Sequence, residues 1–326
     1  MKCIVSGYGI ALDTSIASFG ERSIPMWTDG IESPSFLAYG DGYLFAITEN
    51  TYYASIYAYR RETVGTYRMT DRRGFEGGAL CHIAYSPKHK LLLGACYESG
   101  TVICASFDPQ TGKFGALTSI VQTGEEDQRS RAHCMLLNAA QDHVYTANLG
   151  LDRVFVYRVE NGGLVEETAF DTPRGSGPRH LRLSPDERRL YAITEYSNEV
   201  LVYDTQSLAL LQAISTLPKD YVGASHCSTL CLTPNGRFLY AANRYADTIA
   251  VFTVDENGLL TPAGAFDCGG RSPRHMELSP DGSQLVICCQ DSDWVVFKRL
   301  NPETGMATHT VREIPFNAPG CIVLIP

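Results

Sequence analysis

The sequence predicts an all-β fold, a seven-bladed β-propeller built from four-stranded antiparallel blades. The first observation is a repeated phrase, since Pro-Arg-His occurs at 178–180 and again at 273–275 and opens two similar segments. The second is a regular spacing of about 46 to 51 residues between degenerate copies, which is typical of propeller blades. The third is the absence of any useful segment with helical periodicity. The repeat anchors are Phe36, His82, His133, His180, Thr229, His275 and Cys321.

The fourth copy of the repeat shows the four strands expected of a blade. His180–Ser184 alternates apolar and polar residues, the period-2 pattern of a strand, and Pro185-Asp186 begins a turn. A nearly continuous apolar run, Leu190–Thr194, indicates a second strand buried on both faces. Two further strands are predicted at Val200–Tyr203 and Ala209–Ser215.

The seventh copy is incomplete, because only its first strand, Cys321–Ile325, precedes the C-terminus. Its other strands must come from residues 1–33, where Cys3–Ser6 and Ile16–Phe19 are candidates. Pairing strands from both termini in one blade closes the ring and removes two free sheet edges. We therefore predict one closed propeller domain over residues 1–326.

Composition excludes several classes of partner. The formal net charge is −9 and the pI is near 5.4, which argues against nucleic acid, because a phosphate backbone requires a basic face. No apolar run of about 18 residues is present, so no membrane span is expected. The N-terminus lacks the apolar region and cleavage site of a signal peptide, which favours a cytoplasmic protein.

The eleven cysteines show no disulfide framework and mostly lie in strand-like runs, so we expect free thiols in a reducing compartment. Cys227 and Cys231 lack a second ligand pair, which argues against zinc. We predict no metal and no cofactor.

Polar residues gather where the first strand of a blade starts and the second strand ends, and these two places share one face near the axis. Four of the eight histidines are assigned to one repeat-equivalent position at strand-one starts. A ring of Arg, His, Glu and Asn at one mouth is costly to desolvate unless it binds something polar. An alternative is structural: each histidine bonds the neighbouring blade, and Arg274 pairs with a rim carboxylate. The predicted substrate-binding residues are His82, Asn148, His180, Asn243, Arg274 and His275.

Several motifs together resemble the propeller-type lactonase family, which holds the bacterial 6-phosphogluconolactonases and the fungal carboxy-muconate cyclases. The resemblance covers essentially the whole chain. Residues 147–154, ANLGLDRV, are similar to the family's DLGLDRV segment, and 175–180 match GSGPRH. Glu195-Tyr196-Ser197 resembles another family motif, as does the stretch from Asn243-Arg244 to Asp247-Thr248-Ile249.

The resemblance implies a catalytic set of one His, two Arg and one Glu, which falls on His133, Arg179, Arg244 and Glu195. Three departures bear on the substrate. Arg131 stands where the family often has the first His of His-Pro-His, and Asn148 replaces an Asp. Residues 139–142 replace a Pro-Asp-Gly turn.

The implied activity is hydrolysis of a small anionic sugar lactone, 6-phosphogluconolactone to 6-phosphogluconate, a step of the pentose phosphate pathway, by a monomer or weak homodimer. Glu195 or His133 would be the general base, and the two arginines would bind the anion and polarise the carbonyl. Two alternatives stay open. One is a cycloisomerase acting on a muconolactone with the same four residues, and the other is a non-catalytic binding platform.

Overall fold

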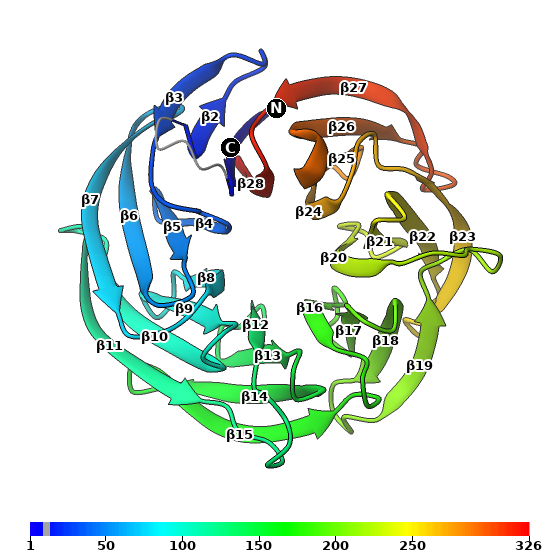
Figure 1. Ribbon diagram of the computed structural model, residues 1–326, viewed down its shortest axis with the longest axis horizontal. Helices are drawn as coiled ribbons and strands as arrows, with labels where there is room; N and C mark the ends of the chain where they lie inside the picture. Colours follow the sequence, from blue (N-terminus) through cyan, green and yellow to red (C-terminus); the bar gives the residue numbers. More distant parts are fainter. Residues whose placement is uncertain (9–13, 326) are drawn as a thin grey trace.

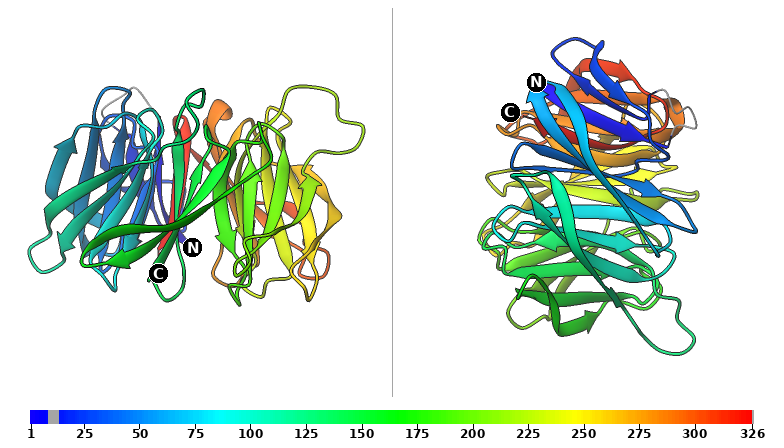
Figure 2. Two further views of the ribbon diagram at one scale, coloured as in Figure 1. Left: turned by 90° about the horizontal axis from the view of Figure 1, so that it is seen from below. Right: turned by 90° about the vertical axis from the view of Figure 1, so that its left-hand side faces the viewer.

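The structure is a computed structural model that describes residues 1–8 and 14–325, and it confirms the seven-bladed propeller. Seven sheets, each of four antiparallel strands, stand around a central axis (Figure 1). Seen from the side, the ring is a flattened disc whose strands run between its two faces (Figure 2). No helix in the described part of the chain is long and apolar enough to cross a membrane.

Blades 1 to 6 each consist of four consecutive strands, numbered from the axis outward. Blade 1 contains β4 (Leu37–Gly40), β5 (Tyr43–Glu49), β6 (Ala54–Thr63) and β7 (Thr66–Phe75). Blade 2 contains β8 (Leu80–Ser86), β9 (Leu91–Cys96), β10 (Thr101–Asp108) and β11 (Lys113–Val121). Blade 3 contains β12 (Ala132–Leu137), β13 (His143–Asn148), β14 (Arg153–Glu160) and β15 (Gly163–Asp171).

The next three blades follow the same order. Blade 4 contains β16 (Pro178–Leu183), β17 (Arg189–Thr194), β18 (Glu199–Asp204) and β19 (Leu210–Ser215). Blade 5 contains β20 (His226–Leu232), β21 (Phe238–Arg244), β22 (Thr248–Val254) and β23 (Leu260–Asp267). Blade 6 contains β24 (Pro273–Leu278), β25 (Gln284–Cys289), a 3-10 turn η1 (Gln290–Ser292), β26 (Trp294–Leu300) and β27 (Ala307–Pro315).

Blade 7 joins the two ends of the chain, as the sequence predicts. Its strands, from the axis outward, are β28 (Pro319–Ile325), β1 (Lys2–Gly7), β2 (Ile16–Phe19) and β3 (Pro25–Asp29). The antiparallel register pairs Ser6 with Cys321 and Cys3 with Leu324. The innermost strand therefore comes from the C-terminus and the other three from the N-terminus, which closes the ring.

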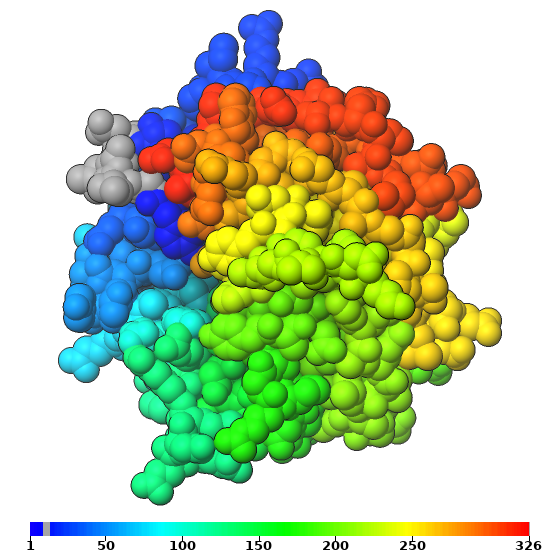
Figure 3. All heavy atoms as spheres, turned by 45° about the vertical axis from the view of Figure 1, so that its right-hand side comes forward, coloured from blue at the N-terminus to red at the C-terminus, as the bar shows by residue number. Residues whose placement is uncertain are grey.

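The hydrophobic core lies between blades rather than within one central mass. Between blades 1 and 2, for example, Phe45 and Ile56 pack in one cluster with Ile83 and Ile103. In the space-filling view, successive blades pack against each other over the visible surface (Figure 3). Second strands are buried on both faces, which explains their continuous apolar runs.

Tyrosine hydroxyls on second strands add a polar tie between neighbouring blades. Tyr191 of β17 donates to the carbonyl of Gly258 at 2.9 Å, and Tyr240 of β21 donates to that of Gly305 at 2.9 Å. Both acceptor glycines have positive φ, a conformation that side-chain-bearing residues rarely adopt. Each buried tyrosine thus satisfies its polar group on an outer turn of the next blade.

In blades 2, 3, 4 and 6, a bulge at the start of the first strand determines which side chain faces the mouth of the propeller. In blade 4, Pro178 pairs with Thr194 and His180 with Ile193, which leaves Arg179 on the bulge. In blade 3, Ala132 pairs with Asn148 and Cys134 with Ala147. The same irregularity occurs in blades 2 and 6. The residues left on these bulges are Cys81, His133, Arg179 and Arg274.

This register corrects one sequence assignment. We predicted that His133 is equivalent to His82, His180 and His275, and that assignment is wrong by one residue. Cys134 occupies the histidine position in blade 3, while His133 is the equivalent of Arg179. The assignment failed because blade 3 has a cysteine where blades 2, 4 and 6 have histidine, and a histidine on the bulge one residue earlier imitates the repeat.

All eleven cysteines are buried and none forms a disulfide. Burial raises the pKa of the Cys104 thiol to about 11 and that of Cys96 to about 12, so both stay protonated at neutral pH. The Sγ atoms of Cys289 and Cys268 lie 3.9 Å apart, well beyond a covalent bond.

Deleting residues 319–326 is expected to give an insoluble or unfolded chain. The deletion removes β28 and exposes the edge of β1. It also removes Ile322 from the core cluster that contains Val5. Solubility and thermal unfolding of the truncated protein measure this. A soluble truncation that melts at the native temperature would contradict the requirement for a closed ring.

Thiol titration is expected to find eleven free thiols after denaturation and few reactive thiols in the native protein. The reason is that every cysteine side chain is buried and protonated thiols react slowly. A count below eleven under denaturing, non-reducing conditions would reveal paired sulfurs and would count against the cytoplasmic prediction.

Candidate active site at the mouth of the propeller

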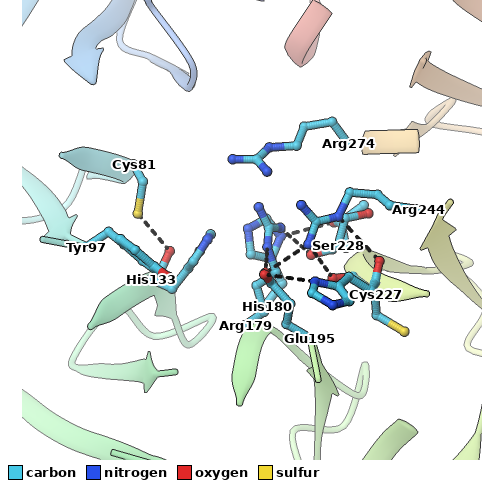
Figure 4. A network of polar contacts seen from close by, with 12 residues as sticks. Cys81, Tyr97, His133, Arg179, His180, Glu195, Cys227, Ser228, Arg244 and Arg274 are labelled. Carbon is cyan, nitrogen blue, oxygen red and sulfur yellow. Dashed lines mark hydrogen bonds and ion pairs between the residues drawn. The ribbon is translucent and has the colours of Figure 1, made fainter. Parts of the chain in front are cut away.

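An Arg–Glu–Arg cluster forms the centre of the site, and it joins blades 4 and 5. Glu195 follows β17 directly, Arg179 lies on the bulge of β16, and Arg244 ends β21. The Oε2 atom of Glu195 lies 2.9 Å from Nε of Arg179 and 3.0 Å from a terminal nitrogen of Arg244 (Figure 4). The three side chains are only 3%, 9% and 15% exposed for Arg179, Arg244 and Glu195, so water screens their charges weakly.

The charges in this cluster determine its protonation. Burial alone would raise the pKa of Glu195, but the positive charges of Arg179 and Arg244 outweigh it and hold that pKa below its ordinary value. Burial, together with the charges of Arg274 and Arg244, lowers the pKa of Arg179 to about 10. At neutral pH the cluster therefore holds two guanidinium cations and one carboxylate.

A third guanidinium, that of Arg274, approaches from blade 6. Arg274 donates to the hydroxyl of Tyr8 at 2.7 Å, and Tyr8 donates to a carboxylate oxygen of Glu49 at 2.7 Å. No carboxylate among the described residues forms a direct ion pair with Arg274. The predicted alternative of a salt bridge to the rim is thus replaced by a chain through Tyr8. In Figure 4, the side chains of Arg274 and His133 point toward the Arg–Glu–Arg cluster.

The sequence analysis did not predict Tyr8 and Glu49 as residues of the site. Glu49 ends the second strand of blade 1, and its amide donates to the Ser33 carbonyl just as the Glu195 amide donates to that of Gly177. Glu49 therefore holds the position in blade 1 that Glu195 holds in blade 4, and this equivalence is a usable signal. Tyr8 holds the equivalent position after β1, the second strand of blade 7, but this blade is divided between the two termini, so the regular spacing does not mark it.

His133 lies on the bulge of β12 with a buried ring nitrogen that has no partner. Its side chain is 5% exposed, and Nδ1 makes no hydrogen bond. Its ring packs edge-on against Tyr97 and His180, at centroid distances of 5.9 and 5.5 Å. Burial, followed by the charges of Arg179 and Arg274, lowers the pKa of His133 well below its ordinary value. The imidazole is therefore neutral at physiological pH and keeps a lone pair that can accept a proton.

The other three predicted histidines form a second layer deeper in the channel. His82 accepts from the Met135 amide at 3.3 Å, His180 contacts the Thr229 hydroxyl at 3.1 Å, and His275 accepts from the Ile322 amide at 3.3 Å. Each bond reaches the next blade, as the structural alternative anticipated. These rings also pack around Phe36, with centroids 4.1 to 6.1 Å away.

Through these contacts, Phe36, His82, His180 and His275 form a packed layer across the channel. A separate cavity of about 310 Å³ borders the same rings and is also lined by Arg182 and Glu277, which lie further along β16 and β24. We therefore assign the three histidines to the joining of blades rather than to direct contact with a substrate at the mouth.

Asn148 and Asn243 lie near the mouth but point into the protein. Both are fully buried. In each side chain the oxygen accepts two hydrogen bonds and the nitrogen donates two. The partners of Asn148 are Gln122 and Ser130 as acceptors and the amides of Arg131 and Leu151 as donors. The partners of Asn243 are the Thr216 carbonyl and Thr248 as acceptors and the Thr216 hydroxyl and Cys227 as donors. With no free donor or acceptor, they hold loops in place, which differs from the predicted role in binding substrate.

A group of aromatic residues lies beside the cluster, and the sequence analysis did not predict this group either. His226 begins β20, and its ring packs edge-on against Tyr196 and Tyr245 at centroid distances of 5.8 and 5.7 Å. Arg131 lies over the ring of Tyr97 at 4.7 Å and donates to its hydroxyl. These residues come from different blades, so nothing local in the sequence links them.

No group of three or more His, Cys, Asp or Glu side chains within residues 1–8 and 14–325 is arranged to hold a metal ion.

The comparisons with known proteins define the class. The profile of the lactonase family described as seven-bladed β-propellers matches residues 14–324, and the chain belongs to that family. A 6-phosphogluconolactonase of Bacillus subtilis is 26% identical over 327 residues, covering 97% of this chain and 93% of the relative. A protein of Staphylococcus epidermidis described as uncharacterised is 29% identical, covering 90% of this chain and 89% of its own length.

Among solved structures, a periplasmic gluconolactonase of Pseudomonas aeruginosa superposes with a TM-score of 0.87 at 23% identity. The match covers 100% of this chain and 99% of that one, and at this identity it supports the shared fold.

Stability is expected to fall as the pH drops below about 6.5, the unfolded pKa of histidine. Burial lowers the pKa of His82, His133 and His180 well below the ordinary value and that of His275 to about 3. Below about pH 6.5 the unfolded chain binds protons at these histidines and the folded protein does not. Each histidine therefore contributes about 1.4 kcal/mol per pH unit to the slope of the unfolding free energy against pH.

Urea unfolding at several pH values between neutral and about pH 5 measures this slope. His180→Gln should reduce it, whereas His309→Gln, at an exposed position on the outer strand β27, should leave it unchanged. An unfolding free energy that stays constant over this range would contradict the neutral, buried state of the histidines.

Proposed function

We propose that this protein hydrolyses an anionic sugar lactone, 6-phosphogluconolactone to 6-phosphogluconate. The observation that carries the proposal is an excess of buried positive charge at the mouth of an acidic protein. Arg179 and Arg244 share the single carboxylate of Glu195, and Arg274 reaches a carboxylate only through Tyr8. A bound phosphate or carboxylate would offset this excess, and guanidinium groups bind such anions in a bidentate manner.

The chemistry follows from the environment of each group. Hydrolysis needs a base that takes a proton from water and positive groups that stabilise the oxyanion on the former carbonyl. His133 is neutral and has an unpaired Nδ1, so we assign it the role of base. Arg179 and Arg244 polarise the carbonyl, and Arg274 binds the phosphate.

Glu195 then acts by holding the two guanidiniums in place. Its Oε2 atom is engaged by both arginines, whereas Nδ1 of His133 has no partner. Family membership and the Bacillus subtilis relative support a lactonase, and the name of that relative, a 6-phosphogluconolactonase, supports the choice of substrate.

The direct test compares three substrates with the purified protein: 6-phosphogluconolactone, unphosphorylated gluconolactone and a carboxylated muconolactone. Proton release is followed after subtraction of spontaneous hydrolysis. We expect the highest kcat/KM for the phosphorylated lactone. Activity confined to the muconolactone would indicate a cycloisomerase, and no rate above background for any substrate would favour a binding platform.

Substitution of Arg274 separates phosphate binding from chemistry. Arg274→Lys keeps the charge but loses the planar guanidinium, so kcat/KM for the phosphorylated lactone should fall by roughly 10- to 100-fold, mainly through KM. The rate with plain gluconolactone should change little. Arg153→Lys is the matched control, because Arg153 forms an ion pair with Asp171 on the outer part of blade 3, away from the mouth. Equal losses on both lactones would contradict the assignment of Arg274 to the phosphate.

A further inference from the structure

The two oxygens of Glu195 face different partners. Oε2 accepts from Arg179 and contacts Arg244, whereas Oε1 lies 3.7 Å from Nδ1 of His226. The first oxygen is therefore fixed by guanidinium groups, while the second is directed toward an imidazole. A carboxylate that faces an imidazole in this way can orient the ring.

The surroundings of His226 hold the ring without sealing it from water. Its side chain is 40% exposed, compared with 5% for the whole of His133, so only His226 can exchange protons readily with solvent. Tyr196 and Tyr245 flank the ring edge-on, each with an interplanar angle of 78°. These contacts restrict the orientation of the imidazole and keep Nδ1 toward Glu195.

The charged and titratable groups that face His226 come from three elements. Arg244 donates to the His226 carbonyl at 3.3 Å through Nε, and Glu195 separates His226 from Arg179. Burial raises the pKa of Tyr196 to about 12, so this phenol stays neutral in the working range of the enzyme. Glu195 is thus the carboxylate that directly contacts the ring.

We propose that His226 is the general acid of the lactonase, paired with Glu195, and that it protonates the ring oxygen of the lactone as the ring opens. The inference rests on the proposed function. It assigns a second histidine, on the opposite side of blade 4 from His133, to the second half of the reaction.

The proton balance is complete with water as the co-reactant. His133 takes one proton from water while the water oxygen forms a bond to the carbonyl carbon. The bond between that carbon and the ring oxygen then breaks, and the ring oxygen takes a proton from His226. Solvent returns a proton to His226 and removes one from His133, and the carboxylic acid product ionises in water.

The different environments of the two histidines suit these opposite roles. His133 is buried beside two guanidiniums, which disfavour its cation, so it begins each cycle as a base. His226 is accessible to solvent, which can return the proton that it donates, and its Nδ1 faces the carboxylate of Glu195. Environments that separate two titratable groups in this way define an acid and a base in one site.

The test is the pH dependence of kcat for His226→Gln with 6-phosphogluconolactone. A general acid must be protonated, so wild-type kcat should decline on the basic side of its profile, and the variant should lose this decline together with roughly 100-fold in kcat. KM should change little, because His226 holds no anion. Added imidazole should restore part of the activity of His226→Ala, where the lost side chain leaves room for it.

The matched control is His143→Gln. His143 is also a partly exposed histidine that contacts carboxylates, Asp142 and Glu167, but it starts β13, at the end of the second strand away from the mouth. This variant should keep the wild-type profile. Thermal unfolding of each variant checks that the propeller is intact.

The outcomes separate the two proposals. A wild-type protein without lactonase activity would overturn the proposed function, and this inference with it. An active wild type whose folded His226→Gln variant keeps both its turnover and its basic limb would overturn the role of His226 alone.

Discussion

The antiparallel pairing of the first and second strands, with a bulge at the start of the first, is the constraint on which the site depends. The pairing brings the start of one strand and the end of the next to the same mouth in every blade. The bulge leaves one residue unpaired, and in blades 3, 4 and 6 this residue is His133, Arg179 or Arg274. The functional groups are thus carried by a repeated backbone irregularity on a rigid sheet, which fixes their positions more closely than a loop would.

Desolvation of charge determines how the cluster behaves. A buried guanidinium without an anion is costly, and here one carboxylate serves two of them. Removing Glu195 would leave two cations buried together, whereas adding an anionic ligand relieves the remaining imbalance. Burial, followed by the charges of Arg179 and Arg274, lowers the pKa of the nearby His133, so charges that would bind the anion also help to keep this imidazole neutral.

The channel is organised in two layers with different tasks. The outer layer carries the Arg–Glu–Arg cluster, Arg274 and His133, and its groups retain free donors or an unpaired nitrogen. In the inner layer, Nδ1 of His82, His180 and His275 forms a hydrogen bond to the next blade. A neutral imidazole can link two blades and pack against Phe36 at the same time, which explains why the repeat places histidine there without a catalytic purpose.

The sequence determined the blades, their four strands and the closure by both termini, because period-2 patterns and turn residues are local signals that recur with each copy. It also placed Arg179, Glu195 and Arg244 at one mouth, since Arg179 belongs to the repeated Pro-Arg-His, and Glu195 and Arg244 follow apolar strands where the repeat favours smaller residues. It could not show that His133 lies on the bulge, because blade 3 has a cysteine at the repeat position of histidine and its own histidine stands one residue earlier. Only the tertiary structure decided that Asn148 and Asn243 are fully bonded inside the protein, and that Tyr8, Glu49 and His226 reach the mouth. Their roles depend on which atoms of other blades lie within hydrogen-bonding distance, and that is settled by how the closed ring packs.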